Sequence, residues 1–593
     1  MSVRAIAVSE DKSKSAPVAC KYFMSYYADE DDFEIDDRGY ITKYTGNLRE
    51  MVVPETIDGI TVKGVAEYGI SKQSLRTIVF PDSVENLENY SLYSCGKIEF
   101  IIGHGIKRIG TEMTWSEILI LDTPAVETIG ELAFQYVGRE LDFPELQEAG
   151  NCLFYCAQNL KEVNFPKLKA VSYKMFSDCY ILRTVKLDSV ESVDADAFAN
   201  CYLLKNIYMP ELKHLINVND QDEGTFYRCF NLTEVNFPLV QEIPDLCFND
   251  CEKLVKADFE SAVSIGYRAF GYCYELNEIN FPKLKEIDSR GFLDTALSDI
   301  NLPSLVTIGK EAFCNSTISS LFAPNLEIIE SNAFSYLRME THIQNKTFKH
   351  LYAPKLTTLS DESLAYTGGL TELDLPSLKT IGENAFYESG VNYLYAPKLQ
   401  TAESLPVVEN AVVVVSDKLT SCTFEPTDKS LTIQGVKDSY SQEYADLNGL
   451  EFIDVNAMGG SIRVTDAGLR FGYSFYDTQK KNVEEYGFVY AQGEKENNEI
   501  TVDDVDSSNV LQLTAYNRLT HEDETTTYNL VFIDIPQTAY NTEISARAYV
   551  KIDGIYYYSD TLCYSFNDIA QKVMSDNEID QNTKNSLNNL LEV

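Results

Sequence analysis

One unit of sequence is copied along most of this chain. The copy at Leu160–Cys179 reads LKEVNFPKLKAVSYKMFSDC, and the next begins at Leu182 as LRTVKLDSVESVDADAFANC. Their common form is Leu-x-x-Ile/Val-x-Phe/Leu-Pro-x-Leu-x-x-Ile/Val, followed after about four residues by Ala-Phe-x-x-Cys. A period of about 22 residues predicts a solenoid, because each unit can bury its apolar face only against its neighbours.

The first half of each unit predicts a short strand. Val163 and Phe165 alternate with Glu162 and Asn164, which is typical of a strand with one buried face. Pro166 ends this strand because proline cannot donate a ladder hydrogen bond. Stacked copies align Leu on Leu, Phe on Phe and Cys on Cys. We therefore expect a parallel sheet on one side and a layer of turns and short strand pieces on the other.

The proline of the pattern gives about 17 units of about 22 residues. Three intervals are longer, Pro54–Pro81, Pro210–Pro238 and Pro324–Pro354, and we expect loops to absorb the extra residues. The loop Asn217–Gly224 is interpreted as plain polar sequence, with a calcium loop as the alternative. The loop Arg338–Lys349 contains His342 and changes the local shape of the array; it lies in the other half of its unit from the first loop.

This pattern resembles the leucine-rich repeats of the BspA-like family, in which the same proline and the same Ala-Phe-x-x-Cys recur. The stretch Leu431–Val455 is similar to the terminal cap of such arrays, with a helix over Ser439–Asn448. The resemblance covers about Asp37–Val455. It implies an α/β-type solenoid rich in β-structure, and a surface or secreted binding protein, although a scaffold does not fix its ligand.

The flanking regions differ in composition from the repeats. A hairpin over Phe33–Tyr44 is expected to cap the first unit. Gly459-Gly460 is interpreted as a break, followed by strand-like segments that predict a small immunoglobulin- or fibronectin-like sandwich beginning with a strand over Ser461–Tyr476. The predicted domains are a lead-in and cap at 1–47, the solenoid at 48–455 with its cap at 431–455, the sandwich at 456–566 and a helical tail at 567–593.

Charge limits the partners of this chain. Its 593 residues carry 91 acidic and 49 basic side chains, a net charge of −42, which disfavours nucleic acid and anionic membrane surfaces. No apolar run approaches the ~18 residues that cross a bilayer, so we expect no membrane insertion. The N-terminal stretch does not read as a signal peptide. The expected location is extracellular or cell-surface, and a virion is the alternative.

The cysteines and histidines do not form a recognisable catalytic pattern. Cysteines recur at the same position of successive units, which predicts a column of buried thiols; a metal or redox ladder is the alternative. These positions are Cys179, Cys201, Cys229, Cys251 and Cys273. The five histidines have no metal or catalytic spacing, and nucleotide and hydrolase motifs do not occur. We therefore predict neither a cofactor, a metal nor enzymatic activity.

The leading hypothesis is a non-catalytic binding or adhesion protein whose repeat surface meets a protein or carbohydrate ligand on a host or microbial surface. The alternative is a structural or host-attachment component of a virion or other particle. Assembly through the C-terminal domain is a further expectation. Outward strand positions become aromatic towards the end of the array, which predicts a binding surface. Its residues are Phe322, His350, Tyr352, Glu372, Asp374, Tyr393 and Tyr395.

Overall fold

A computed structural model describes residues 3–8, 19–24, 26–96, 98–114, 118, 120–133, 143–217, 223–335, 345–427, 429–479, 481–505 and 509–591. The chain divides into two compact units. The first unit is Met1–Leu326 with Asn332–Ile343, and the second is Glu327–Ser331 with Gln344–Val593. The repeats make about 18 turns of β-solenoid, close to the predicted number. Much of the loops Asn217–Gly224 and Arg338–Lys349, including His342, lies outside the described residues.

Each solenoid turn contains two short strands and a hydrogen-bonded turn segment. In the turn that begins at Leu160, these strands are β17 (Glu162–Asn164) and β18 (Ala170–Val171). Val163 is buried, whereas Glu162 and Asn164 are exposed, which confirms the predicted alternation. In the turn segment, the N–H groups of Phe176 and Asp178 donate to carbonyls of the next turn at 2.8 and 2.9 Å. This turn is therefore bonded to the next one on all three sides.

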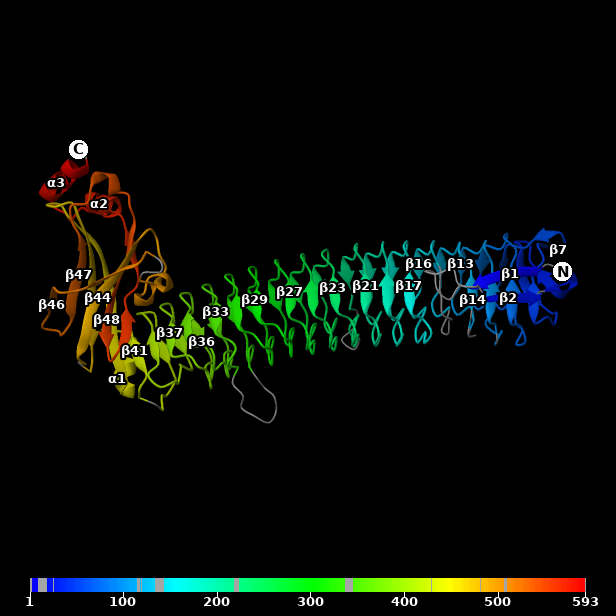
Figure 1. Ribbon diagram of the computed structural model, residues 1–593, viewed down its shortest axis with the longest axis horizontal. Coiled ribbons are helices and arrows are strands. Elements are labelled where there is room, and N and C mark those ends of the chain that lie inside the picture. The colour runs from blue at the N-terminus through cyan, green and yellow to red at the C-terminus, as the bar shows by residue number, and fades with distance from the viewer. Residues whose placement is uncertain are drawn as a thin grey trace. The chain divides into compact units, whose positions relative to one another are not determined.

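The strands of successive turns form two parallel ladders (Figure 1). The first-strand ladder of the first unit comprises β6 (Glu50–Val52), β10 (Thr77–Val79), β12 (Phe100–Ile102), β14 (Ile120–Asp122), β17, β19 (Thr184–Lys186), β21 (Asn206–Tyr208), β23 (Glu234–Asn236), β25 (Lys256–Asp258), β27 (Glu278–Asn280), β29 (Asp299–Asn301) and β31 (Ser320–Phe322). The second-strand ladder comprises β9 (Gly64–Val65), β11 (Asn86–Leu87), β13 (Arg108–Ile109), β15 (Thr128–Ile129), β16 (Glu148–Ala149), β18, β20 (Ser192–Val193), β22 (His214–Leu215), β24 (Glu242–Ile243), β26 (Ser264–Ile265), β28 (Glu286–Ile287) and β30 (Thr307–Ile308).

The N-terminal part of the first unit contains short antiparallel pairs. The predicted capping hairpin is present as β4 (Phe33–Ile35) and β5 (Tyr40–Tyr44), with Gly39 at a left-handed φ of 86° in its turn. The remaining elements of this part are β1 (Val3–Val8), β2 (Ala19–Met24), β3 (Tyr26–Tyr27), the 3-10 helix η1 (Glu30–Asp32), β7 (Thr56–Ile57) and β8 (Ile60–Thr61).

The core of the first unit consists of stacked columns. Phe176, Phe198 and Phe226 are fully buried, and their rings stack with centroids 5.2 and 5.3 Å apart. The predicted thiol column is confirmed: each of its five cysteines is fully buried, and Cys201 Sγ donates to the carbonyl of Phe176 at 3.1 Å. No disulfide bond joins the cysteines whose side chains the structure describes. Burial raises the pKa of the Cys201 thiol.

The second unit contains the last turns and everything after them. Its first-strand ladder runs through β33 (His350–Tyr352), β35 (Glu372–Asp374), β37 (Tyr393–Tyr395), β39 (Val412–Val414) and β41 (Thr432–Gln434). Its second-strand ladder runs through β32 (Ile328–Ile329), β34 (Thr358–Leu359), β36 (Thr380–Ile381), β38 (Thr401–Ala402) and β40 (Ser421–Cys422). The predicted cap helix is α1 (Tyr440–Asn448), which ends at Gly449 with a left-handed φ of 66°.

The expected break at Gly459-Gly460 is wrong. Both glycines lie inside the long strand β42 (Glu451–Arg463), where the pairing shifts register between Ala457 and Gly459. β42 pairs in parallel with β41 and antiparallel with β43 (Gly468–Asp477), so the last solenoid sheet continues into the C-terminal strands. The predicted strand over Ser461–Tyr476 is therefore two strands joined by a turn. The boundary predicted at residue 456 falls within β42.

The C-terminal strands form two antiparallel arrangements around a common core. One continues β42-β43 with β47 (Thr526–Phe532) and β46 (Arg518–Thr520). The other has the order β45 (Leu511–Thr514), β44 (Val483–Gln492), β48 (Ile544–Ile552) and β49 (Ile555–Tyr558), and β50 (Leu562–Tyr564) also pairs with β48. Phe471, Tyr473, Phe488 and Tyr528 from both sheets share the core.

The remaining elements of the second unit are helical. The 3-10 helices η2 (Asn497–Glu499), η3 (Val502–Asp504) and η4 (Gln537–Ala539) lie in loops between the strands. The helices α2 (Phe566–Ser575) and α3 (Gln581–Leu591) occupy the segment for which a helical tail was predicted. Phe566 and Leu587, one from each helix, are buried in a shared small core.

Candidate functional site

The seven residues of the predicted binding surface all occupy outward positions of the first-strand ladder. In each three-residue strand the central side chain points into the core, and the flanking two point away from it. Phe322 is the last residue of β31 in the first unit and is 45% exposed. The other six lie in the second unit, in pairs on β33, β35 and β37.

Three of the six residues in the second unit are open to solvent. His350 and Tyr352 on β33 are exposed, with Tyr352 at 46%, and Glu372 on β35 is exposed as well. β33 and β35 belong to consecutive turns of the solenoid, so the three side chains lie on neighbouring strands. This part of the predicted surface has the expected exposure.

The expected exposure of Tyr395 is wrong, and Tyr393 is only partly exposed. Tyr395 retains 7% of its surface because C-terminal strands cover it. Its hydroxyl donates to the Asp560 carboxylate and accepts a hydrogen bond from Asn497 Nδ2 at 2.5 Å. Burial, together with the nearby charge of Asp560, raises the pKa of Tyr395. These two tyrosines therefore lie at a junction within the second unit.

Asp374 and Arg547 belong to the same junction. Asp374 is half-buried, its Oδ1 has no hydrogen-bond partner in the part of the chain that the structure describes, and burial raises its pKa despite the opposing charge of Arg547. The Arg547 guanidinium donates to the carbonyls of Ser559 and Asn497, at 2.6 Å each. It also lies over the ring of Tyr558, 4.5 Å from the centroid. Asp374 thus faces the chain's own C-terminal strands and is not part of an open surface.

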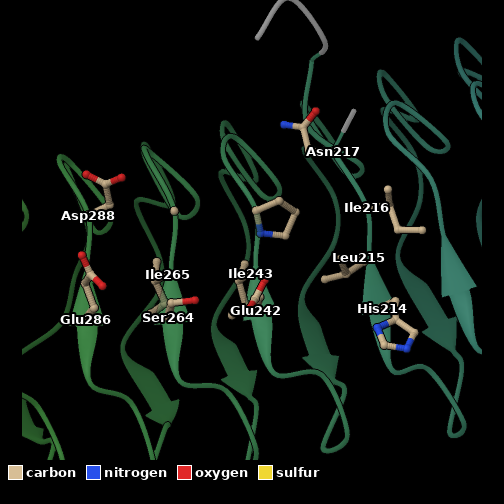
Figure 2. Close-up of a pocket in the computed structure, with 12 residues that line it drawn as sticks. His214, Leu215, Ile216, Asn217, Glu242, Ile243, Ser264, Ile265, Glu286 and Asp288 are labelled. Atoms are coloured by element: carbon tan, nitrogen blue, oxygen red, sulfur yellow. The ribbon is translucent and has the colours of Figure 1, made fainter. Parts of the chain in front are cut away.

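The second-strand ladder of the first unit carries a groove of about 590 Å³, which the repeat pattern did not predict (Figure 2). Its walls come from β22, β24, β26 and β28 and from the residues that follow these strands. The apolar side chains of Leu215, Ile243 and Ile265 form its floor, since they point into the solenoid core. The polar residues labelled in Figure 2 are His214, Asn217, Glu242, Ser264, Glu286 and Asp288.

The groove lies where both ladders are interrupted, between β21 and β23 and between β22 and β24. Pro244 explains the interruption of the second-strand ladder. In the next turn, Gly266 occupies the equivalent position and donates its backbone N–H to the carbonyl of Ile243 at 2.8 Å. Pro244 has no N–H, so the corresponding acceptor, the carbonyl of Leu215, receives no such bond. A proline at this position, beside the long interval Pro210–Pro238, was the available sequence signal.

In the part of the chain that the structure describes, no cluster of three or more histidine, cysteine, aspartate or glutamate side chains is placed to hold a metal ion. Within the same residues, no helix combines the length and apolar character needed to span a membrane.

The sequence model described as BspA type leucine rich repeat region matches residues 40–137, 127–255, 241–356 and 342–427. Because these matches cover more than half of the chain, the protein belongs to the BspA-type leucine-rich repeat family. The resemblance drawn from the repeat pattern is thereby confirmed.

Three solved structures are similar over long stretches. The pneumococcal vaccine antigen PcpA is 14% identical, with 67% of this chain and 86% of that chain covered and a TM-score of 0.24. A leucine-rich repeat protein from Eubacterium ventriosum is 12% identical, with 60% and 92% covered and a TM-score of 0.23. An internalin from Listeria monocytogenes is 12% identical, with 50% and 80% covered and a TM-score of 0.19. With TM-scores this low, the three structures do not indicate a function for this chain. Comparison with curated proteins gave no match.

Proposed function

We propose that this protein is a non-catalytic binding protein, which presents its solenoid surface to a protein or carbohydrate ligand on a cell surface. The observation that supports this proposal is the difference between the inward and the outward positions of each repeat. Inward positions are fixed by the stacked core, whereas outward positions vary from turn to turn and are solvent-exposed over much of the array. Repeat arrays with this property use their extended surfaces for recognition.

The first candidate surface is the part of the predicted patch that has the expected exposure, namely His350, Tyr352 and Glu372. Tyr352 contributes an amphipathic ring, and Glu372 provides a carboxylate on the next first strand. An exposed aromatic ring beside a carboxylate suits recognition of a sugar or a peptide. Phe322 stays a candidate in the first unit. An extracellular or cell-surface location follows from the same proposal.

The experiment compares the double variant His350→Ala/Tyr352→Ala with Tyr208→Ala. Tyr208 is the last residue of β21, the position that Tyr352 holds in β33, and it is 54% exposed. Binding of purified variants to glycan arrays and to fixed host and bacterial cells should fall at least tenfold for the double variant only, with unchanged melting temperatures. Equal binding by both variants places the ligand elsewhere and removes this surface from the proposal.

For the C-terminal strands we propose an immunoglobulin- or fibronectin-like sandwich that also supports assembly. The order β42-β43-β47-β46 against β45-β44-β48-β49 corresponds to strands A-B-E-D against C′-C-F-G of that class. The edge strands β45 and β46 expose Leu511, Leu513 and Leu519. Replacing Leu511 and Leu519 with Lys should abolish any self-association seen by light scattering; an unchanged mass distribution excludes these edges.

A further inference from the structure

The groove between β22 and β24 has a surplus of hydrogen-bond acceptors. Among the described residues, no donor reaches the carbonyl of Lys213 or of Leu215, which in other turns would bond to the following turn. The side-chain oxygen of Asn217 is buried and has no hydrogen-bond partner among the described residues. Backbone donors nearby are already committed, since Gly266 and Asp288 donate to the turn before them. A ligand in this groove must therefore bring donors.

The acidic side chains around the groove also favour a ligand with hydrogen-bond donors, and specifically a cation. Glu242, Glu286 and Asp288 line the groove, and none of these three carboxylates forms an ion pair with a described residue; Asp288 accepts one bond, from the backbone N–H of Ser289. The adjacent cation Lys213 is bound to Glu191 at 3.0 Å, and this pairing lowers the pKa of Glu191. Among the lining residues that the structure describes, His214 is the only other basic side chain.

The arrangement of these carboxylates favours an organic cation over a metal ion. Glu242 and Glu286 hold the same position two turns apart, with Ser264 between them (Figure 2). Two strand spacings put their backbones about 10 Å apart, and among the described residues no group of three or more His, Cys, Asp or Glu side chains is placed to hold a metal ion. A planar guanidinium with five N–H donors on a long side chain can reach one carboxylate and the unpaired carbonyls together.

We propose that this groove binds an arginine side chain of a protein ligand, with lysine as the weaker alternative. The inference deepens the proposed binding function and rests on it. The guanidinium lies in the interruption made by Pro244, where it bonds to the Leu215 carbonyl and the Asn217 amide oxygen. Glu242 and Glu286 supply the charge on either side. A carbohydrate fits this groove less well, because no Phe, Tyr or Trp ring among the described residues lines it for a sugar ring to stack on.

The test uses the full chain and two small probes, N-acetyl-arginine methylamide and its neutral isostere N-acetyl-citrulline methylamide. Saturation-transfer NMR at about 0.15 M salt, where long-range attraction is screened, reports binding of each probe. We expect the arginine probe to bind at least tenfold more tightly than the citrulline probe, and tetra-arginine to compete with it. Equal binding of the two probes overturns the proposal.

Charge-matched variants separate the groove from the general field of an acidic protein. Glu242→Gln/Glu286→Gln removes two carboxylates from the groove and should weaken the arginine probe at least tenfold. Glu234→Gln/Glu278→Gln removes two exposed carboxylates with the same two-turn spacing from the first-strand ladder, and should change binding less than twofold. Equal losses of affinity in both variants show that the probe responds only to the overall negative charge of the protein, and overturn the site. The cell and glycan assay above remains an independent test, so failure of the groove is distinguishable from failure of the binding function.

Discussion

Replacing Tyr395 with phenylalanine tests whether the last solenoid turns and the C-terminal strands are joined by a polar junction. The substitution keeps the ring, which is 7% exposed, and removes only the hydroxyl. The bond to the Asp560 carboxylate is charge-assisted and contributes about 1.5–3 kcal/mol, and the bond from Asn497 about 1 kcal/mol. Asn497 Nδ2 also lies 3.4 Å from Asp560 Oδ1, so part of the second bond is recovered. We expect a net loss of about 2–3 kcal/mol.

Hydrogen exchange of the intact chain measures this loss locally, because the junction opens without global unfolding. A loss of about 2 kcal/mol corresponds to roughly thirtyfold faster exchange. The effect should occur together in β37 and in β48 and β49, because Tyr395 shares one core with Ala546 and Ala548 of β48 and with Tyr557 of β49. Tyr208→Phe is the matched control: its ring holds the equivalent position of β21 and is 54% exposed, so exchange there should change less than threefold.

Two outcomes would refute this reasoning. If Tyr395→Phe leaves exchange in β37 and β48 unchanged, the hydroxyl contributes nothing to the junction. If only β37 exchanges faster, the solenoid end opens independently of the C-terminal strands and the two do not form one cooperative unit. A double-mutant cycle with Asp560→Asn should return a coupling of at least about 1 kcal/mol between the two side chains.

Three further predictions concern stability. In the native protein, thiol reagents should not modify the cysteine column, and Cys201→Ser should cost less than about 1.5 kcal/mol in urea unfolding, because a hydroxyl can donate to the Phe176 carbonyl as the thiol does. Burial raises the pKa of Asp454 to about 6, so the folded state binds a proton more tightly and stability falls as pH rises from about 4 to 6. Asp454→Asn should remove this loss, a gain of about 2–3 kcal/mol at pH 8 and none at pH 4, measured by urea unfolding. Truncation after Thr427 deletes β41 and β42, leaves the edge of β39 unpaired, and should cause aggregation detectable by light scattering.

Each of these predictions has a clear contrary result. Rapid labelling of Cys201 in the native protein contradicts its burial. A stability profile of Asp454→Asn that parallels the wild type from pH 4 to 8 shows that this carboxyl is not the titrating group; the amide keeps the bond that the Lys437 N–H donates to Asp454 at 2.9 Å. A truncated chain that stays monomeric with an unchanged melting temperature shows that β41 and β42 do not protect the array.

The repeat made the solenoid predictable because its period fixes which residues meet in the core. Val163 and Phe176 are buried where the pattern places them, and Glu162 is exposed. The helix of the cap was predictable for a local reason as well, since Gly449 supplies the left-handed residue that ends it. In both cases, the determining interactions lie within one turn or between neighbouring turns.

What covers an outward position was not predictable from the repeat, because it depends on residues far away in the chain. Tyr393 and Tyr395 read as an exposed pair, yet the residues that bond to Tyr395 follow it by more than 100 positions. Gly459-Gly460 read as a break for a similar reason. Pairing of β42 with β41 and β43 outweighs the conformational freedom of two glycines. The strand after β37 did carry a sequence signal of burial. The outward residues of β39, Val412 and Val414, are aliphatic, and both are buried.

The same relation between apolar outward residues and burial holds in the first unit. In β10 and β12 the outward residues Val79, Phe100 and Ile102 are aliphatic or aromatic, and all three are buried. From β17 to β29 the outward positions are mostly polar, as in the exposed pair Glu278 and Asn280. Burial of apolar outward residues is favourable only where something covers them, whereas polar ones remain hydrated. The first-strand ladder between β17 and β29 therefore remains mostly hydrated. The proposed arginine groove lies within this same stretch, on the second-strand ladder.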